Sequence, residues 1–209
     1  MSDLKMVLII IGASIAIVLV MIFGLSKISN DGGTKAEVNT LLEGAKLSTQ
    51  SGEVKATVVV FSDMQCPACK AADRLIGGLA NTEGVLFVMR HFPLMGHKYS
   101  TNGAKAVEAA RQMNKGWEMM DLLFEKQEEW SGVGGKEIDS RLADYAVSLG
   151  LERVEYETRL KSTETAEVVS GDKLLGERLR LSGTPTIFVN GEQVSPEFVM
   201  GKVNELLTK

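Results

Sequence analysis

The pattern of hydrophobic and polar positions begins with one long apolar run. Residues 6–25 carry no charged side chain, and about 20 such residues make a helix long enough to cross a bilayer core of about 30 Å. We therefore expect a retained transmembrane anchor over residues 1–26. A cleaved secretory signal is the alternative, although its apolar region is normally shorter. A buried core helix is a third interpretation, and the lack of any polar face argues against it.

A polar stretch follows the apolar run. Residues 27–53 include Ser-Asn-Asp-Gly-Gly near their start and contain at most one short helix, near 37–47. We expect this stretch to be a linker that spaces the globular part from the membrane. Lys5 on one side of the run faces Lys27 and Lys35 on the other, so charge alone gives little bias for orientation.

The globular part opens with a predicted strand, helix and strand. Residues 56–61 form a β-branched apolar run, typical of a strand buried on both faces of a sheet. Residues 66–80 contain good helix formers, with Pro67 in the first turn. Residues 84–90 form a second buried strand. The three together predict a β-α-β unit with a right-handed crossover.

The rest of the sheet is predicted near the end of the chain. Residues 183–189 indicate a strand, and Asn190-Gly191 is a strong hairpin signal before a short return strand at 192–194. A final helix is expected over residues 195–207, with serine as its cap and proline in its first turn.

A helical insertion separates the two parts of this sheet. Apolar side chains recur there at three- and four-residue spacing in two stripes: Val107, Ala110, Met113, Trp117, Met120 and Phe124, then Ile138, Leu142, Tyr145 and Leu149. Glycine-rich residues 132–135 connect the stripes, and shorter amphipathic stretches at 151–160 and 165–181 bring the expected number of helices to about four. We therefore predict an α/β domain over residues 54–209 with a helical insertion at about 96–181.

Composition narrows the possible functions. The chain has 209 residues and a net charge of -4, without a block of like charge that would indicate a nucleic-acid partner. Its two cysteines lie three positions apart, so they cannot form the cross-linked framework of a small secreted protein.

The two cysteines are the candidate chemistry. Cys66 and Cys69 sit at the predicted junction between a strand and a helix. Backbone N–H groups and the helix dipole stabilise a thiolate at that position, which lowers the thiol pKa. Cys66 is therefore the expected nucleophile of a redox-active disulfide. Cys69, one turn later on the same helix face, is the expected resolving thiol.

Two other interpretations of the cysteines are open. His91 and His97 would complete four zinc ligands, but the interval from Cys69 to His91 is longer than in most zinc fingers and spans a predicted helix and strand. His91 itself is expected to be a packed or partly exposed residue at a strand end rather than a catalytic base. Alternatively, the cysteines are inert core residues, which a proline-containing C-x-x-C after a buried strand argues against.

Several ordered motifs resemble one family. They are the segment 61–70 (FSDMQCPACK), the segment 90–94 (RHFPL), the region 117–130 with Phe124 and Gln127, and the segment 183–191 (GTPTIFVNG). From residue 54 to the C-terminus the chain is similar to DsbA-type thiol:disulfide oxidoreductases. The resemblance implies a thioredoxin fold interrupted by a helical subdomain, with Cys66 and Cys69 redox-active.

The resemblance also implies roles for neighbouring residues. Pro185 would be a cis proline beside the cysteines, and the backbone of Thr184 would pair with an incoming peptide as an added strand. Pro67 and Ala68, between the cysteines, would tune the reduction potential. The best-known family member has histidine where this chain has Ala68, and that change affects how strongly the thiolate is stabilised.

Location and partners follow from the same resemblance. A dithiol oxidase acts where secreted chains acquire disulfides, so we expect a single-pass protein of the cell membrane with its catalytic domain outside. Its substrates would be unfolded or partly folded secreted proteins, with a quinone-linked membrane partner for reoxidation. We expect a monomer without metal or cofactor.

Three function classes are compatible with these residues. An oxidase and a membrane-tethered reductase would use the same cysteines in opposite directions, and the reduction potential separates them. A non-catalytic peptide-binding module is the third class, which the intact Cys66, Cys69 and Pro185 argue against. An isomerase is not favoured, because the region before the first strand is too short for a dimerisation domain.

Overall fold

The computed structural model describes residues 35–135 and 137–209, and the chain from Lys35 to Lys209 forms one compact unit. The expected transmembrane anchor over residues 1–26 lies outside the described residues. Among the residues that are described, no helix combines the length and the apolar character that a membrane span requires.

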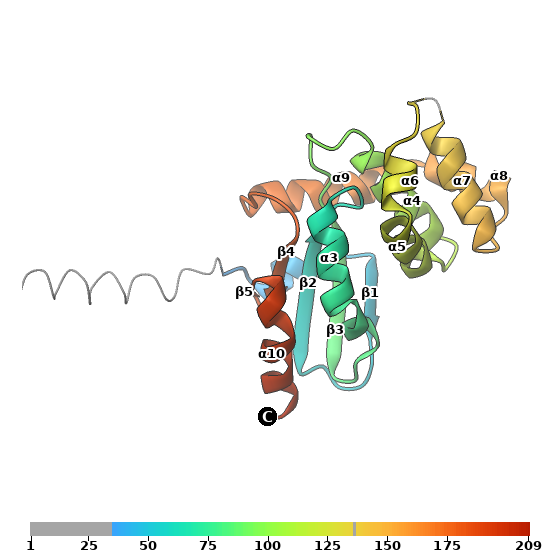
Figure 1. Cartoon of the computed structure of the whole chain (residues 1–209). Coiled ribbons are helices and arrows are strands. Elements are labelled where there is room, and N and C mark those ends of the chain that lie inside the picture. Colours follow the sequence, from blue (N-terminus) through green and yellow to red (C-terminus); the bar gives the residue numbers. More distant parts are fainter. Residues whose placement is uncertain (1–34, 136) are drawn as a thin grey trace, which may run out of the picture. The chain divides into compact units, whose positions relative to one another are not determined.

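The described strands form one mixed sheet (Figure 1). Its centre is β2 (Ala56–Ser62), whose seven residues are all buried. This strand pairs in parallel with β3 (Val85–His91) and antiparallel with β4 (Thr186–Val189), and the edge strands are β1 (Leu47–Gln50) and β5 (Glu192–Gln193). The strand order is β1-β3-β2-β4-β5. The predicted central strand and its parallel partner are confirmed.

Helices cover both faces of the sheet. The side chains of Val58, Val60 and Phe87 on one face meet α3 (Pro67–Ile76), the short 3-10 helix η1 (Gly77–Asn81) and α10 (Pro196–Leu207). On the other face, Val59, Phe61 and Val88 pack against Leu41 of α2 (Val38–Leu42) and Leu175 of α9 (Thr163–Arg178). Alternate residues of a strand point to opposite faces, so the apolar run of β2 supplies both cores.

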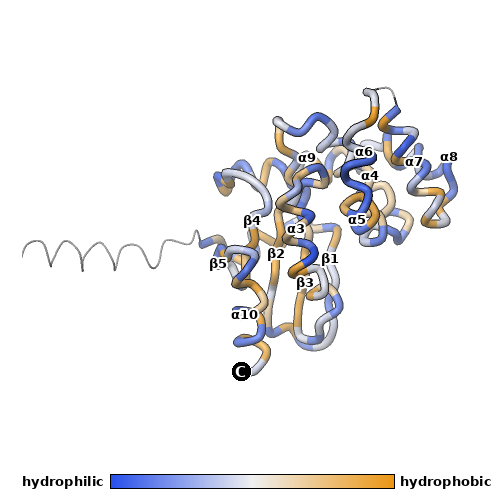
Figure 2. The backbone as a smooth tube through the Cα atoms, in the orientation of Figure 1, coloured by the Kyte–Doolittle hydropathy of each residue, from blue (hydrophilic) through white to orange (hydrophobic). Residues whose placement is uncertain are grey.

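The predicted helical insertion is present, in more pieces than expected. It contains α4 (Ser100–Arg111), α5 (Gly116–Glu125), α6 (Gln127–Ser131), α7 (Ile138–Ser148), α8 (Arg153–Leu160) and α9. Helices α4 to α8 share a core around Trp130, Leu123 and Tyr156, which are fully buried, whereas Leu175 of α9 packs against the sheet. Figure 2 shows hydrophobic and hydrophilic stretches alternating along them, as in helices with one face on a core.

The first predicted stripe is interrupted between α4 and α5. Asn114 has a φ of 60°, and the backbone N–H of Lys115 bonds back to the carbonyl of Ala110 at 2.8 Å. Asparagine tolerates this left-handed conformation better than most residues. The apolar spacing nevertheless continues across the break, because both helices face the same core.

The expected linker over residues 27–53 is wrong from Lys35 onward. Residues 47–50 are the edge strand β1, paired antiparallel with β3. Leu41 is 0% exposed and Leu47 4% exposed. Each of these two short elements buries a single leucine, so neither has the long apolar run of a core element, although their backbones belong to the fold.

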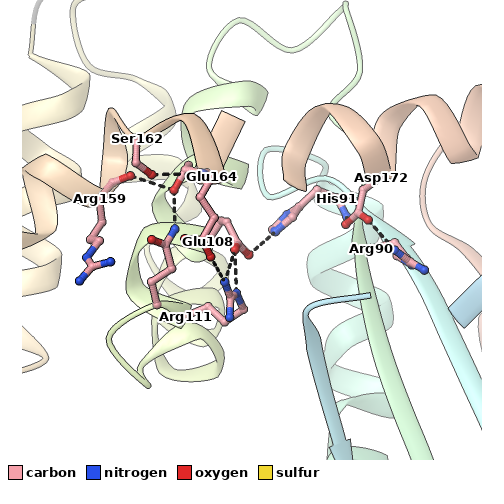
Figure 3. A network of polar contacts seen from close by, with 10 residues as sticks. Arg90, His91, Glu108, Arg111, Arg159, Ser162, Glu164 and Asp172 are labelled. Atoms are coloured by element: carbon pink, nitrogen blue, oxygen red, sulfur yellow. Dashed lines mark hydrogen bonds and ion pairs between the residues drawn. The ribbon is translucent and has the colours of Figure 1, made fainter. Parts of the chain in front are cut away.

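A buried ion pair joins this N-terminal segment to the rest of the domain. The guanidinium of Arg90, 2% exposed, donates to the carbonyls of Leu41 (2.7 Å) and Glu43 (2.6 Å) and to the Asp172 carboxylate (2.7 Å). The other Asp172 oxygen accepts from the backbone N–H of His91 at 2.9 Å (Figure 3). These hydrogen bonds offset the cost of burying two charges, and they connect α2, β3 and α9.

His91 is packed inside the domain, as predicted. It is 1% exposed, and its Nε2 lies 3.9 Å from a carboxylate oxygen of Glu108 on α4 (Figure 3). Burial lowers the pKa of His91 and raises the pKa of Glu108. The Glu108 carboxylate also accepts from the Arg111 guanidinium at 2.7 Å, so this contact links β3 to α4 between the sheet and the helical insertion.

The buried position of Leu41 gives a direct test of the corrected boundary. Leu41→Ala should lower the free energy of unfolding of the chain from Lys35 by about 2–5 kcal/mol, because it leaves a cavity between α2 and β2. Urea unfolding followed by circular dichroism measures this change. Val154, 68% exposed, is the matched control, and Val154→Ala should change stability by less than about 0.5 kcal/mol. Equal, small effects of the two changes would restore the linker interpretation.

Candidate active site at the start of helix α3

The two cysteines lie where the central strand ends and α3 begins. Cys66 is the N-cap of the helix with an extended backbone (φ -81°, ψ 119°), and Pro67 occupies the first turn. Both cysteines are free thiols, 6% exposed for Cys66 and 2% for Cys69. Pro67 and Ala68 between them are exposed. The structure thus places the predicted motif at the predicted junction.

The segment 183–185 approaches the motif from the start of β4. The peptide bond Thr184–Pro185 is cis, as the resemblance implied. The Cys66 sulfur lies 3.5 Å from the Thr184 carbonyl oxygen, which accepts from the thiol when Cys66 is protonated. The buried hydroxyl of Thr184 makes no hydrogen bond to another group of the described residues, so it is available to the Cys66 thiolate. All four residues that sequence reasoning assigned to redox chemistry and substrate binding therefore meet at one place.

The two thiols differ in acidity. Interaction with the Cys69 thiol, then with Thr184, and then with the backbone N–H groups of Cys69 and Ala68 lowers the pKa of Cys66 from 9.0 to about 5, against the opposing effect of burial. The pKa of Cys69 is raised, first by Cys66 and then by burial. At neutral pH one sulfur is therefore a thiolate and the other a thiol that donates to it.

The turn before Cys66 is tied to neighbouring elements. The buried side-chain amide of Gln127 on α6 donates to the carbonyls of Met64 (2.8 Å) and Cys66 (3.1 Å). The Gln65 side chain accepts from the backbone N–H of Tyr99 at 2.7 Å. A helix of the insertion thus contributes directly to the geometry of the cysteines.

A small apolar cavity lies behind the resolving cysteine. It is lined by Cys69, Val60, Ile76, Phe87, Met89 and Phe124, among others. Asp73, one turn beyond Cys69 on α3, stands at its margin. Burial and the nearby charge of Asp121 raise the pKa of Asp73 to about 6. Sequence reasoning does not single out Asp73, because a lone acidic residue within an amphipathic helix is usually a solvated one.

The histidines do not join the cysteines in a metal site. His91 is directed to Glu108, while His97 contacts the carboxylate of Asp63 at 2.7 Å through its Nδ1. In the described part of the chain, no three or more His, Cys, Asp or Glu side chains are arranged to hold a metal ion.

Comparison with known proteins gives one family match. The thioredoxin family model matches residues 48–207. The Na(+)/H(+) antiporter NhaA 1 of Mycolicibacterium vanbaalenii is 35% identical over 141 residues, which are 64% of this chain but only 21% of that protein. The chain therefore spans about a fifth of the length of the curated relatives that it matches first.

Two further matches cover more of the partner protein. The "Probable disulfide bond formation protein D" of Bacillus cereus is 32% identical over 155 residues, 68% of each chain. The thiol-disulfide exchange protein alpha-DsbA2 of Wolbachia pipientis has the same fold, with a TM-score of 0.68 over 81% of this chain and 91% of that one, at 19% identity. The resemblance to DsbA-type proteins is confirmed.

The buried hydroxyl of Thr184 leads to a prediction about the Cys66 thiolate. Thr184→Val keeps the shape of the side chain but removes a hydrogen-bond donor to the Cys66 thiolate, so the pKa of Cys66 should rise above about 5. The measurement is thiolate absorbance near 240 nm during a pH titration of the reduced protein. Thr158→Val, which removes an exposed hydroxyl of α8, is the control and should leave the titration unchanged. An unaltered midpoint in Thr184→Val would mean that this hydroxyl does not reach the sulfur.

Proposed function

Because the chain belongs to the thioredoxin family, we propose that it is an extracytoplasmic, membrane-anchored oxidase that introduces disulfides into secreted proteins. The observation that carries this proposal is the asymmetry of the two thiols, with a low pKa at Cys66 and a raised pKa at Cys69. A stabilised Cys66 thiolate favours the reduced form of the pair. The oxidised form is then a good acceptor of electrons from substrate thiols.

Disulfide transfer proceeds in two exchange steps. A substrate thiolate attacks the Cys66 sulfur of the Cys66–Cys69 disulfide, which forms a mixed disulfide and releases Cys69, which takes up a proton. A second substrate thiolate then attacks the substrate sulfur of the mixed disulfide and releases Cys66 as a thiolate. The substrate loses two electrons and gains a disulfide, and the protein ends as a reduced pair.

The segment 183–185 supports a mode of substrate binding. The Thr184 carbonyl lies 3.5 Å from the Cys66 sulfur, and both Thr184 and Pro185 are partly exposed. An extended peptide paired with the Thr184 backbone as an added strand would carry its own sulfur towards Cys66. Recognition through backbone groups suits unfolded or partly folded substrates, because it does not depend on one side-chain sequence.

The name of one relative is consistent with this direction of exchange. The Bacillus cereus relative is called a "Probable disulfide bond formation protein D", whereas the name of the Wolbachia protein, a thiol-disulfide exchange protein, states no direction. The antiporter relatives match over about a fifth of their length, so ion transport is not part of the proposal. Reoxidation of the reduced pair would fall to a quinone-linked membrane partner.

The location rests on the N-terminal sequence and on redox chemistry. Residues 6–25 form an uncharged apolar run of the length that a membrane anchor requires. Stable protein disulfides form on the oxidising side of a membrane and are rare in the cytosol. We therefore place the unit from Lys35 onward outside the cytoplasm, as a monomer.

The order of attack can be tested by trapping. Cys69→Ser should accumulate mixed disulfides when the free Cys66 thiolate attacks a disulfide of an oxidised, unfolded substrate and releases one substrate thiol, because no Cys69 thiol is left to resolve the adduct. The adducts should appear as high-mass bands on non-reducing gels that collapse with dithiothreitol. Cys66→Ser should form no such bands, and neither variant should turn over. If the bands persist in Cys66→Ser and vanish in Cys69→Ser, the roles assigned to the two cysteines are reversed.

The location has a separate test. Protease added to intact spheroplasts of cells that produce the full chain should digest the globular domain while cytosolic marker proteins stay whole. The apolar run should leave the protein in the membrane fraction after washing with high salt or carbonate. Protection of the domain until the cells are lysed would place the active site in the cytosol and contradict the proposed role.

A further inference from the structure

The carboxylate of Asp63 is buried beside the cysteines and accepts three hydrogen bonds. Its side chain is 0% exposed. One oxygen accepts from the backbone N–H of Gln65 at 2.8 Å. The other accepts from the backbone N–H of Leu94 at 3.0 Å and from Nδ1 of His97 at 2.7 Å. Since an ionised carboxylate can only accept, the His97 nitrogen must carry the proton in this contact.

The backbone of the same residue touches both cysteines. The N–H of Asp63 points at the Cys69 sulfur, with 3.5 Å between nitrogen and sulfur, and its carbonyl accepts from the N–H of Cys66 at 3.0 Å. Among the described residues, Asp63 therefore connects the strand end, the motif and the loop at 94–97.

From these contacts we propose that Asp63, supported by His97, is a positioning residue that aims its own backbone N–H at the Cys69 sulfur. The inference rests on the proposed disulfide exchange. When the Cys66–Cys69 disulfide is opened, the Cys69 sulfur leaves with the electron pair of the broken bond. A fixed N–H donor at that sulfur stabilises the developing thiolate without reorganisation, as backbone donors do in oxyanion holes.

The peptide plane that carries the Asp63 N–H is held on both sides. The Ser62 carbonyl in that plane accepts from the backbone N–H of Phe92 at 2.8 Å. On the other side, residues 63–66 form a turn rather than a ladder, so the direction of the N–H also depends on how this turn is anchored. The Gln127 amide holds the later carbonyls of the turn. The Asp63 carboxylate holds the turn against the backbone N–H of Leu94 and the ring of His97, which are parts of the chain about 30 residues away.

His97 is the more exposed member of the pair. Its side chain is 28% exposed, whereas the Asp63 carboxylate that it contacts is enclosed. An N–H group of His97, whether the ring is charged or neutral, gives the buried Asp63 carboxylate a hydrogen-bond donor. Loss of the donor leaves a buried acceptor oxygen with fewer partners, which loosens the turn without removing any atom from the cysteines.

The test measures how fast the disulfide opens. In the oxidised protein, the second-order rate constant for reduction of the Cys66–Cys69 disulfide by glutathione should fall about tenfold in Asp63→Asn. The amide of asparagine has one acceptor oxygen where the carboxylate has two, so at least one of the three donors faces an N–H group and loses its acceptor. His97→Ala should also slow this step, whereas His97→Asn, which can place an amide N–H near the position of Nδ1, should restore the rate to near that of the unaltered protein.

The control separates positioning from stability. Asp172 is a second buried carboxylate that accepts from a backbone N–H and from a side chain. Asp172→Asn should destabilise the fold yet leave the rate per folded molecule unchanged. Rates are compared at a temperature where urea unfolding shows each variant to be folded. If Asp63→Asn does not fold, the comparison of His97→Ala with His97→Asn tests the positioning role instead.

The outcomes distinguish this inference from the function on which it rests. If the unaltered disulfide does not react with glutathione, the proposed exchange chemistry fails. If the unaltered protein reacts and folded Asp63→Asn or His97→Ala reacts equally fast, the exchange chemistry stands and Asp63 is only a structural residue. Equal slowing by Asp172→Asn would likewise overturn the positioning role.

Discussion

The contact between two sulfurs at the N-terminus of α3 is the interaction on which the account of this protein depends. Cys66 and Cys69 share a proton unequally, and the Cys69 thiol contributes most to the low pKa of Cys66. The N–H groups at the start of the helix and the Thr184 side chain add to it. Every other feature of the site fixes the positions of these two sulfurs or brings a substrate to them.

The architecture explains why so many distant segments meet there. The turn that carries Cys66 follows the central strand, Thr184 precedes the antiparallel neighbour of that strand, and Gln127 comes from the helical insertion. The buried Arg90–Asp172 pair fixes β3 against α2 and α9 on the opposite face of the sheet. The helical insertion is thus part of the active site as well as a cover for it, because one of its helices holds the turn before the nucleophile.

Much of this could be predicted from the sequence, for physical reasons that differ between elements. Residues 58–61 and 85–89 are apolar throughout because both faces of these strands are covered, and such runs are readily recognised. The edge strand β1 was missed because it buries Leu47 alone among four residues, and its membership depends on backbone pairing with β3. Hydrogen bonds between backbone groups leave no pattern in the side chains.

The residues of the site also differ in how readily the sequence reveals them. Cys66, Cys69, Thr184 and Pro185 lie in motifs with a recognisable order, and the structure brings them together. Asp63 gives a weaker signal, an acidic residue directly after a buried strand, and its contact with His97 joins positions 34 residues apart. Only the folded chain reveals such a pair.

The equilibrium reduction potential of the unaltered Cys66–Cys69 pair, measured in glutathione buffers, tests the central claim most directly. A thiolate stabilised by its neighbours favours the reduced form. The account therefore predicts a potential less negative than that of thioredoxin, which is about -270 mV. A potential more negative than this value would contradict the oxidase assignment and would identify the protein as a reductase that uses the same two cysteines.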